Sequence, residues 1–65
     1  MKKTYILNQL EKTKDLNTLR VNLTKLHPYD IAKVFPALNE ENRKKIYAIF
    51  DDEKLADIFS YLEDS

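Results

Sequence analysis

The feature that most constrains the fold of this 65-residue chain is a 12-residue unit that occurs three times in succession, at 27–38, 39–50 and 51–62. In every unit the eighth residue is β-branched, the ninth is aromatic and the twelfth is large and apolar. These residues are Val34, Ile46 and Ile58, then Phe35, Tyr47 and Phe59, then Leu38, Phe50 and Leu62. A repeat of one short helix and one tight turn is typical of an α-solenoid, whose units bury their apolar faces only by stacking on their neighbours. The repeat therefore predicts an all-α fold and favours a role in binding or regulation over catalysis.

The apolar spacing and the capping residues predict about five helices in a single domain that spans residues 1–65. Each 12-residue unit opens with a residue that caps a helix or tolerates a turn. The expected helices are Lys3–Lys12, a second capped by Asp15, a third that starts at Pro28 after His27, a fourth capped by Asn39, and a fifth capped by Asp51 or Asp52 that runs to Leu62. Pro36 should kink or loosen the third helix, because proline lacks a backbone N–H and clashes with the preceding turn.

The apolar side chains of these helices are expected to form one core. They are Ile6, Leu7, Leu10, Leu16, Leu19, Leu23, Leu26, Ile31, Val34, Phe35, Leu38, Ile46, Tyr47, Ile49, Phe50, Leu55, Ile58, Phe59 and Leu62. Helices of about ten residues are not stable alone, so each depends on its neighbours. Because nothing in the sequence would cover the far side of the last helix, we expect the chain to be a piece of a longer domain.

Composition argues against several functional classes. Without cysteine the chain has no disulfide framework, and without glycine it has no phosphate-binding loop. Helix ends must therefore rely on Asn, Asp and Lys instead of a glycine in the left-handed conformation. The single histidine, His27, has no nucleophile or orienting acid beside it, so we expect a turn role and no enzymatic activity. No apolar run approaches the roughly 20 residues that cross a bilayer.

Charge is balanced overall but sorted along the chain. Residues 1–33 carry seven basic and three acidic side chains, a charge of +4, whereas residues 34–65 carry four and eight, a charge of −4. A net charge of zero and an acidic second half argue against binding to nucleic acid. The acidic end suits cations or a basic partner, and the alternative is that it is only a solvated tail.

Two carboxylates of the last helix form the candidate metal site. The helix face opposite the apolar residues carries Glu53, Asp57, Ser60 and Asp64, and the first two lie side by side because they are four residues apart. Mg²⁺ prefers oxygen ligands, keeps several waters and is often held by one or two carboxylates. Asp57 and Glu53 are therefore candidate Mg²⁺ ligands, and the alternative is an acidic stripe that is merely solvated.

Three stretches of the chain resemble the cytosolic N-terminal domain of MgtE-type magnesium transporters and channels. They read Leu-His-Pro-Tyr-Asp-Ile-Ala at 26–32, Leu-Asn-Glu-Glu at 38–41 and Phe-Asp-Asp-Glu-Lys-Leu-Ala-Asp-Ile-Phe at 50–59. The similarity extends over about residues 16–62 and rests on the order and spacing of these stretches. The Leu19-Arg20 pair also matches the family's second helix.

The resemblance implies a right-handed superhelix of short helices, similar to armadillo-type solenoids, with this chain as the first half of the N-domain. In such proteins the domain lies on the cytoplasmic side of the cell membrane and precedes a pair of CBS domains and a transmembrane pore, all within a homodimer. Mg²⁺ bound between the N-domain and the CBS domains holds the pore closed. The implied partners are thus the CBS domains and pore of the same protein, without nucleic acid and without membrane insertion of this segment.

The resemblance also ranks the acidic residues. Asp57 is the acid of the Ala-acid-Ile stretch and so the first candidate for a carboxylate that faces the metal, whereas Glu53 is a neighbour by geometry. Asp30 is expected to be a helix-start acid. Because the partner acids would come from other domains, the chain alone should bind Mg²⁺ weakly or not at all. Pro36 departs from the family pattern.

A free-standing α-solenoid that binds other proteins is the alternative function. The armadillo-like part of the flagellar motor switch protein FliG is similar in its helical repeat and uses its surface for protein contacts. An enzyme ranks behind both hypotheses, because no nucleophile–base pair and no cofactor motif is visible.

Overall fold

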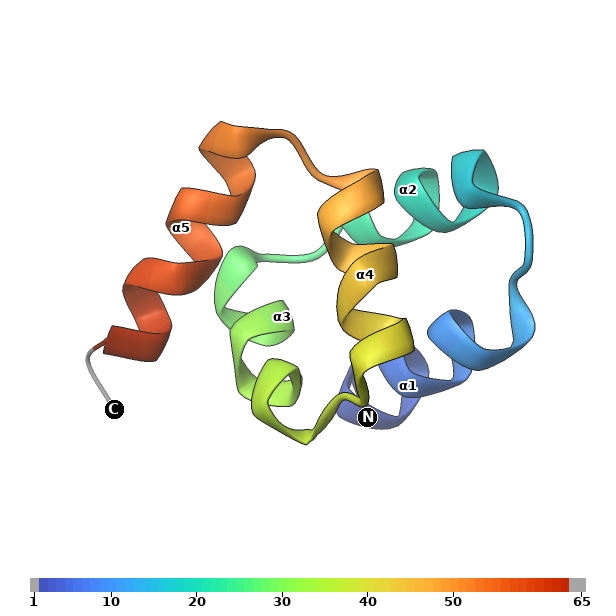
Figure 1. The fold of residues 1–65 in the computed structure, drawn as a ribbon, viewed down its shortest axis with the longest axis horizontal. Coiled ribbons are helices and arrows are strands. Elements are labelled where there is room, and N and C mark those ends of the chain that lie inside the picture. Colours follow the sequence, from blue (N-terminus) through green and yellow to red (C-terminus); the bar gives the residue numbers. More distant parts are fainter. Residues whose placement is uncertain (1, 64–65) are drawn as a thin grey trace.

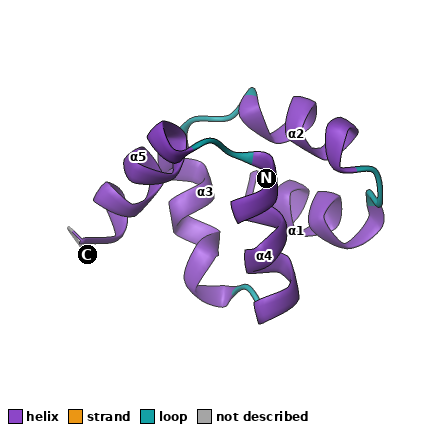
Figure 2. Cartoon of the chain, turned by 45° about the horizontal axis from the view of Figure 1, so that its top comes forward, coloured by secondary structure: helices purple, strands orange, loops and turns teal. Residues whose placement is uncertain are grey.

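The structure, a computed structural model, describes the backbone of residues 2–63 and contains no strand in that range. Its elements are α1 (Lys2–Lys12), α2 (Leu16–Thr24), α3 (Pro28–Val34), the 3₁₀ turn η1 (Phe35–Ala37), α4 (Glu40–Ile49) and α5 (Asp52–Glu63). The predicted all-α fold is confirmed. Figure 2 shows that the helices follow one another through short loops.

The helices pack in two rows, because each helix contacts the helix two places along the chain. α3 packs against both α1 and α5, and α2 packs against α4 (Figure 1). α1 also touches α2 and α4, which joins the two rows. Stacking of this kind is typical of α-solenoids. The right-handed twist of the superhelix stays a prediction.

The repeated positions of the 12-residue units build the core. The three β-branched residues, Val34, Ile46 and Ile58, are all fully buried. The three aromatic residues meet in a triangle of edge-to-face rings, a geometry that favours aromatic pairs. The ring centroids are 5.6 Å apart for Phe35–Phe59, 6.1 Å for Phe35–Tyr47 and 6.1 Å for Tyr47–Phe59. Residues 24 apart in the sequence are thus in direct contact through the repeat.

The predicted core is confirmed for most residues and wrong for two. Leu16 is 41% exposed because it is the first residue of α2, where no other helix covers it. Tyr47 is 49% exposed because its ring meets Phe35 and Phe59 on one side, and no helix of the described chain covers the other. The residues that are only partly buried are Leu7, Leu26, Leu55, Phe59 and Leu62.

The first residue of every 12-residue unit is the N-cap of a helix, as predicted. Each of the three side chains accepts a hydrogen bond from a backbone N–H in the first turn of its helix. The distances are 3.0 Å from Tyr29 N to His27 Nδ1, 2.8 Å from Asn42 N to Asn39 Oδ1 and 2.8 Å from Lys54 N to Asp51 Oδ1. The turn role expected for His27 is therefore confirmed.

Asp15 caps α2 in the same way, as predicted. Its Oδ2 accepts hydrogen bonds from the hydroxyl of Thr18 at 2.7 Å and from the backbone N–H of Thr18 at 3.1 Å. Both bonds stabilise the ionised carboxylate and hold the pKa of Asp15 below its ordinary value. A carboxyl group with a lowered pKa contributes stability that is lost as the pH falls through that pKa.

The capping role of His27 at the start of α3 can be tested by substitution. Replacing His27 by Ala removes the acceptor and should lower the free energy of unfolding by about 1 kcal/mol. His27→Asn, which copies the cap of the next unit, should recover most of that loss. Urea unfolding followed by circular dichroism measures both variants, and an Asn variant no more stable than the Ala variant would contradict the capping role.

Cationic side chains from other elements bind carbonyl groups near the carboxyl ends of α1, η1 and α4. No described residue has a positive φ, so no left-handed cap is present in that part of the chain. Instead, side-chain donors form hydrogen bonds with carbonyl oxygens near helix ends. The distances are 2.7 Å from Lys45 Nζ to Leu10 O, 3.0 Å from Arg20 Nε to Ile49 O and 3.1 Å from Arg43 Nη2 to Pro36 O. The expectation that Asn, Asp and Lys would serve all helix ends is therefore corrected, because two of these three donors are arginines.

Pro36 loosens the third helix as predicted. α3 ends at Val34, and the chain continues as the 3₁₀ turn η1, which contains Pro36. Arg43 braces this turn, since its guanidinium lies 5.2 Å from the centre of the Phe35 ring while donating to the Pro36 carbonyl.

The hydrogen bond from Lys45 of α4 to the Leu10 carbonyl of α1 joins the two rows of helices. Its contribution can be measured by comparing substitutions of Lys45 and of the adjacent Lys44. Lys45→Met should lower the free energy of unfolding by about 1–2 kcal/mol, because it leaves the Leu10 carbonyl without its charged donor. Lys44→Met makes the same chemical change at an exposed residue of α4 and should have little effect. Equal losses in thermal unfolding would show that the Lys45 contact contributes nothing specific.

Candidate functional site

The candidate carboxylates lie on the exposed face of α5. Ile58 anchors the opposite face of the helix and is fully buried, whereas Glu53 and Asp57 are exposed. Ser60 is exposed as well, and its hydroxyl donates to the backbone carbonyl of Asp57 at 2.7 Å. The predicted acidic stripe is thus confirmed for these residues, while its last predicted member, Asp64, lies outside the described residues.

Glu53 and Asp57 share a shallow depression of about 210 Å³ with Asp51 and Lys54. Three acidic residues and one lysine therefore line it. Asp51 is engaged as the N-cap of α5, so its Oδ1 already accepts a hydrogen bond. In the sequence, Lys54 is the single basic residue of the acidic segment 51–65. Its spacing of three residues before Asp57 is the signal that places both on one side of a helix.

The residues fit a cation that keeps most of its water. Within residues 2–63, no group of three or more His, Cys, Asp and Glu side chains is arranged to hold a metal ion. Two exposed carboxylates suit Mg²⁺, which keeps several waters, and do not suit the four-ligand sites typical of structural zinc. An ion held by Asp57 and Glu53 must take its remaining ligands from water or from another surface.

Asp30 has a structural position, as expected of a helix-start acid. It occupies the first turn of α3, and its carboxylate lies 3.3 Å from the Lys2 ammonium. The side chain is only 15% exposed, and the Oδ2 atom that approaches Lys2 has no hydrogen bond in the structure. The contact is therefore an ion pair that fastens the start of α1 to α3.

A larger depression was not predicted from the sequence. It measures about 490 Å³ and lies where the ends of α2 and α4 meet the start of α5. Arg20, Thr24, Phe50, Asp51 and Lys54 are among its lining residues. Arg20 crosses this depression to bind the Ile49 carbonyl, so its guanidinium is committed to a structural contact. Lys54 borders both this depression and the acidic one.

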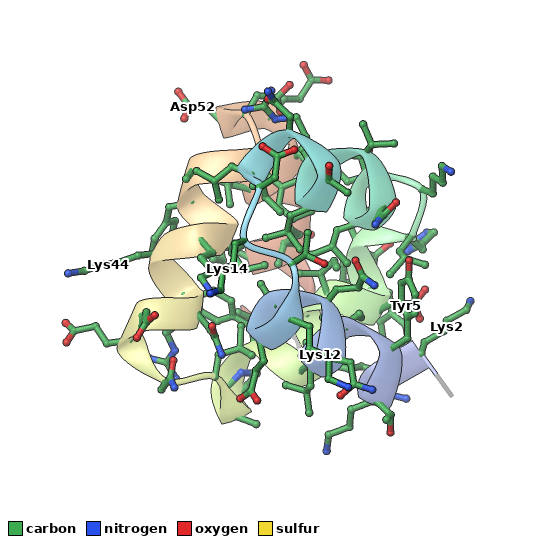
Figure 3. The ribbon with its side chains drawn as sticks, turned by 90° about the vertical axis from the view of Figure 1, so that its right-hand side faces the viewer. Lys2, Tyr5, Lys12, Lys14, Lys44 and Asp52 are labelled. Atoms are coloured by element: carbon green, nitrogen blue, oxygen red, sulfur yellow. The ribbon has the colours of Figure 1, made fainter. Side chains whose placement is uncertain are left out.

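Two lysines of the basic first half and one acid of the second half lie at opposite sides of the molecule. Lys2 and Lys12 extend from α1 at the lower side of Figure 3, whereas Asp52 extends from the start of α5 at the upper side. Of the helices in the described part of the chain, none combines the length and the apolarity that a membrane span requires.

Comparison with known proteins agrees with the resemblance noted in the sequence. The family model of the MgtE intracellular N domain matches residues 26–65, a range that contains all three 12-residue units and both candidate carboxylates. The match begins ten residues later than the resemblance, which started at residue 16. No curated protein and no solved structure matches the chain. Because the family match covers more than half of its residues, this chain belongs to the MgtE intracellular N-domain family.

Proposed function

We propose that this chain is the Mg²⁺-sensing cytosolic part of a magnesium channel or transporter and that it gates the pore through Mg²⁺-dependent contacts with CBS domains. Membership of the MgtE family supports the proposal. The observation that carries it is the pair of carboxylates, Glu53 and Asp57, on the exposed face of α5. The pair is too small to complete a metal site alone, which is the property expected of one half of a site shared between two surfaces.

The gating step follows from electrostatics. Without a cation, the acids of α5 repel the acids of a facing CBS domain, so the two surfaces separate. A bound Mg²⁺ bridges the carboxylates and stabilises only the associated arrangement. The ion therefore shifts a two-state equilibrium by the difference between its affinities for the two states. The associated arrangement keeps the pore of the homodimer closed.

The residues of the site have distinct roles in this mechanism. Asp57 is the primary carboxylate and Glu53 supports it from the preceding turn. α5 acts as a rigid arm, because Ile58 and the aromatic triangle fix it on the core. Since half of the ligands belong to another domain, the chain alone binds Mg²⁺ weakly.

A protein-binding module remains the second candidate, and one observation favours it. Tyr29 and Tyr61 are 48% and 38% exposed, and their rings meet edge to face at 5.5 Å beside His27. Exposed aromatic residues are enriched where proteins bind each other. If this surface carries the function, Tyr61→Ser weakens partner binding, whereas Asp57→Asn and removal of Mg²⁺ leave that binding unchanged.

The role of Asp57 is tested by titrating Mg²⁺ into the chain and into the complete cytosolic region. In the chain, amide signals of residues 51–57 should shift with millimolar midpoints. In the complete region, Mg²⁺ should cause compaction that small-angle scattering detects. Asp57→Asn should weaken both responses at least about tenfold, because removing one of two anionic ligands removes much of the attraction.

Asp52→Asn is the matched control. It makes the same chemical change on the same helix, but Asp52 does not line the acidic depression. This variant should retain most of the response. Unchanged affinity and unchanged compaction in Asp57→Asn would show that Asp57 is not a ligand. If NaCl of equal ionic strength causes the same amide shifts as MgCl₂, the acidic face binds no specific ion and is merely solvated.

A further inference from the structure

We propose that the outer surface of α1 and α2 docks onto an anionic lipid bilayer and lies on its headgroups without crossing it. The proposal goes beyond Mg²⁺ sensing, because it concerns a different part of the molecule from the candidate carboxylates. Figure 1 shows α1 and α2 at one end of the molecule and α5 at the other.

The excess of basic charge belongs entirely to this end. Residues 2–25, which contain α1 and α2, carry six basic and two acidic side chains, a charge of +4. Residues 26–65 carry five and nine, a charge of −4. A surface with a positive excess is attracted to anionic headgroups and repelled by a basic partner.

Two lysines at this end are available to a partner outside the chain. Figure 3, which views this end of the molecule, shows Lys12 on α1 and Lys14 on the loop that follows, and both are exposed. Within residues 2–63 the one ion pair joins Lys2 to Asp30, so no carboxylate of that range pairs with Lys12 or Lys14. The cationic side chains that donate hydrogen bonds there are Arg20, Arg43 and Lys45.

The acidic residues of α1 and its following loop do not neutralise these lysines. Asp15 is engaged as the N-cap of α2, where its carboxylate accepts two hydrogen bonds from Thr18. Glu11 lines a depression together with Lys45 and residues at the start of α4, so it lies toward α4. The lysine charges therefore remain open to solvent or to a partner.

Exposed apolar side chains accompany the lysines. Tyr5 on α1 is 41% exposed, and Val21 on α2 is 55% exposed. Val21 is two residues from both Leu19 and Leu23, which are fully buried, so helical geometry places it on the opposite, outward side of α2. Lysine next to apolar and aromatic side chains is typical of surfaces that lie in the headgroup region of a bilayer.

A bilayer fits this surface better than a purely charged partner does. The ammonium groups would bind lipid phosphates and carboxylates, while Val21 and Tyr5 would enter the boundary below the headgroups. The cytoplasmic leaflet of a membrane carries anionic lipids, and this chain belongs to a family of intracellular domains of membrane transporters.

The test is co-sedimentation of the chain with vesicles of phosphatidylcholine, with and without phosphatidylserine, in the absence of Mg²⁺. The chain should bind only the vesicles that contain phosphatidylserine, and added KCl should weaken the binding. Lys14→Gln should reduce the affinity about fivefold, and the double variant with Lys12→Gln at least about tenfold, since each lysine contributes separately near an anionic surface. Val21→Ser should weaken binding as well, because it removes an apolar contact.

Lys44→Gln is the matched control. It removes the same charge from an exposed residue of α4, where Figure 3 shows Lys44 extending away from the body of the protein, and should leave the affinity nearly unchanged. The melting temperatures of the Lys12 and Lys14 variants should equal that of the unmodified chain, because neither side chain has an ion pair or hydrogen bond within residues 2–63. A loss of binding then reports the surface and not unfolding.

Three results would overturn the proposal. The first is no binding to phosphatidylserine vesicles at low salt. The second is an equal loss in Lys14→Gln and Lys44→Gln, because overall charge would then explain the attraction. The third is self-association without vesicles that Lys14→Gln abolishes, detected by sedimentation velocity, which would assign the surface to a second copy of the chain. Because the test contains no Mg²⁺, its result is independent of whether Asp57 binds that ion.

Discussion

The fold depends on one constraint, which is that none of its described helices is longer than 12 residues. Helices of this length are marginal in water, so their stability comes from packing against other helices. The shortest of them, α3, shows the consequence, because it has seven residues and packs against both α1 and α5. Its Ile31 and Val34 are fully buried, and burial of such a side chain contributes about 1.5–3 kcal/mol. The stability of these short helices therefore requires that the repeated units stack on one another.

Short helices also create many helix ends, and this chain satisfies them without glycine. The amino ends use the side chains of Asp15, His27, Asn39 and Asp51. The carboxyl ends of α1 and α4 receive hydrogen bonds from a lysine and an arginine of other helices, which match the negative end of the helix dipole. Because these donors come from other helices, each such contact both completes a helix end and joins two elements. Some of the basic side chains of this neutral protein therefore have a structural role.

The packing of α5 explains why the candidate carboxylates are exposed. α5 packs through one side against α3, which leaves its acidic side open. An acidic face is costly to bury unless its charges are paired, so it remains exposed until a cation or a basic group compensates it. Glu53 and Asp57 lie on this open side and line one depression together with Asp51 and Lys54.

The sequence by itself determined the class of the fold, the positions of the N-caps and the register of the core. These features follow from local chemistry, since capping depends on one residue and its following turn, and burial of Val34, Ile46 and Ile58 follows from a strict period. The exposed placement of Glu53 and Asp57 was predictable for the same reason, because it needs only the geometry of one helix.

Only the tertiary structure decided which helices meet and which charges share a surface. Leu16 and Tyr47 match the apolar pattern but are exposed, because burial depends on whether another helix covers the position. The donors to the carboxyl ends of α1 and α4 lie 35 and 29 residues from their acceptors, a separation that no local pattern encodes. The closing of the aromatic triangle likewise required the packing of η1, α4 and α5. Periodicity is a local property that a chain carries in its sequence, whereas contact between distant residues is set by how its helices stack.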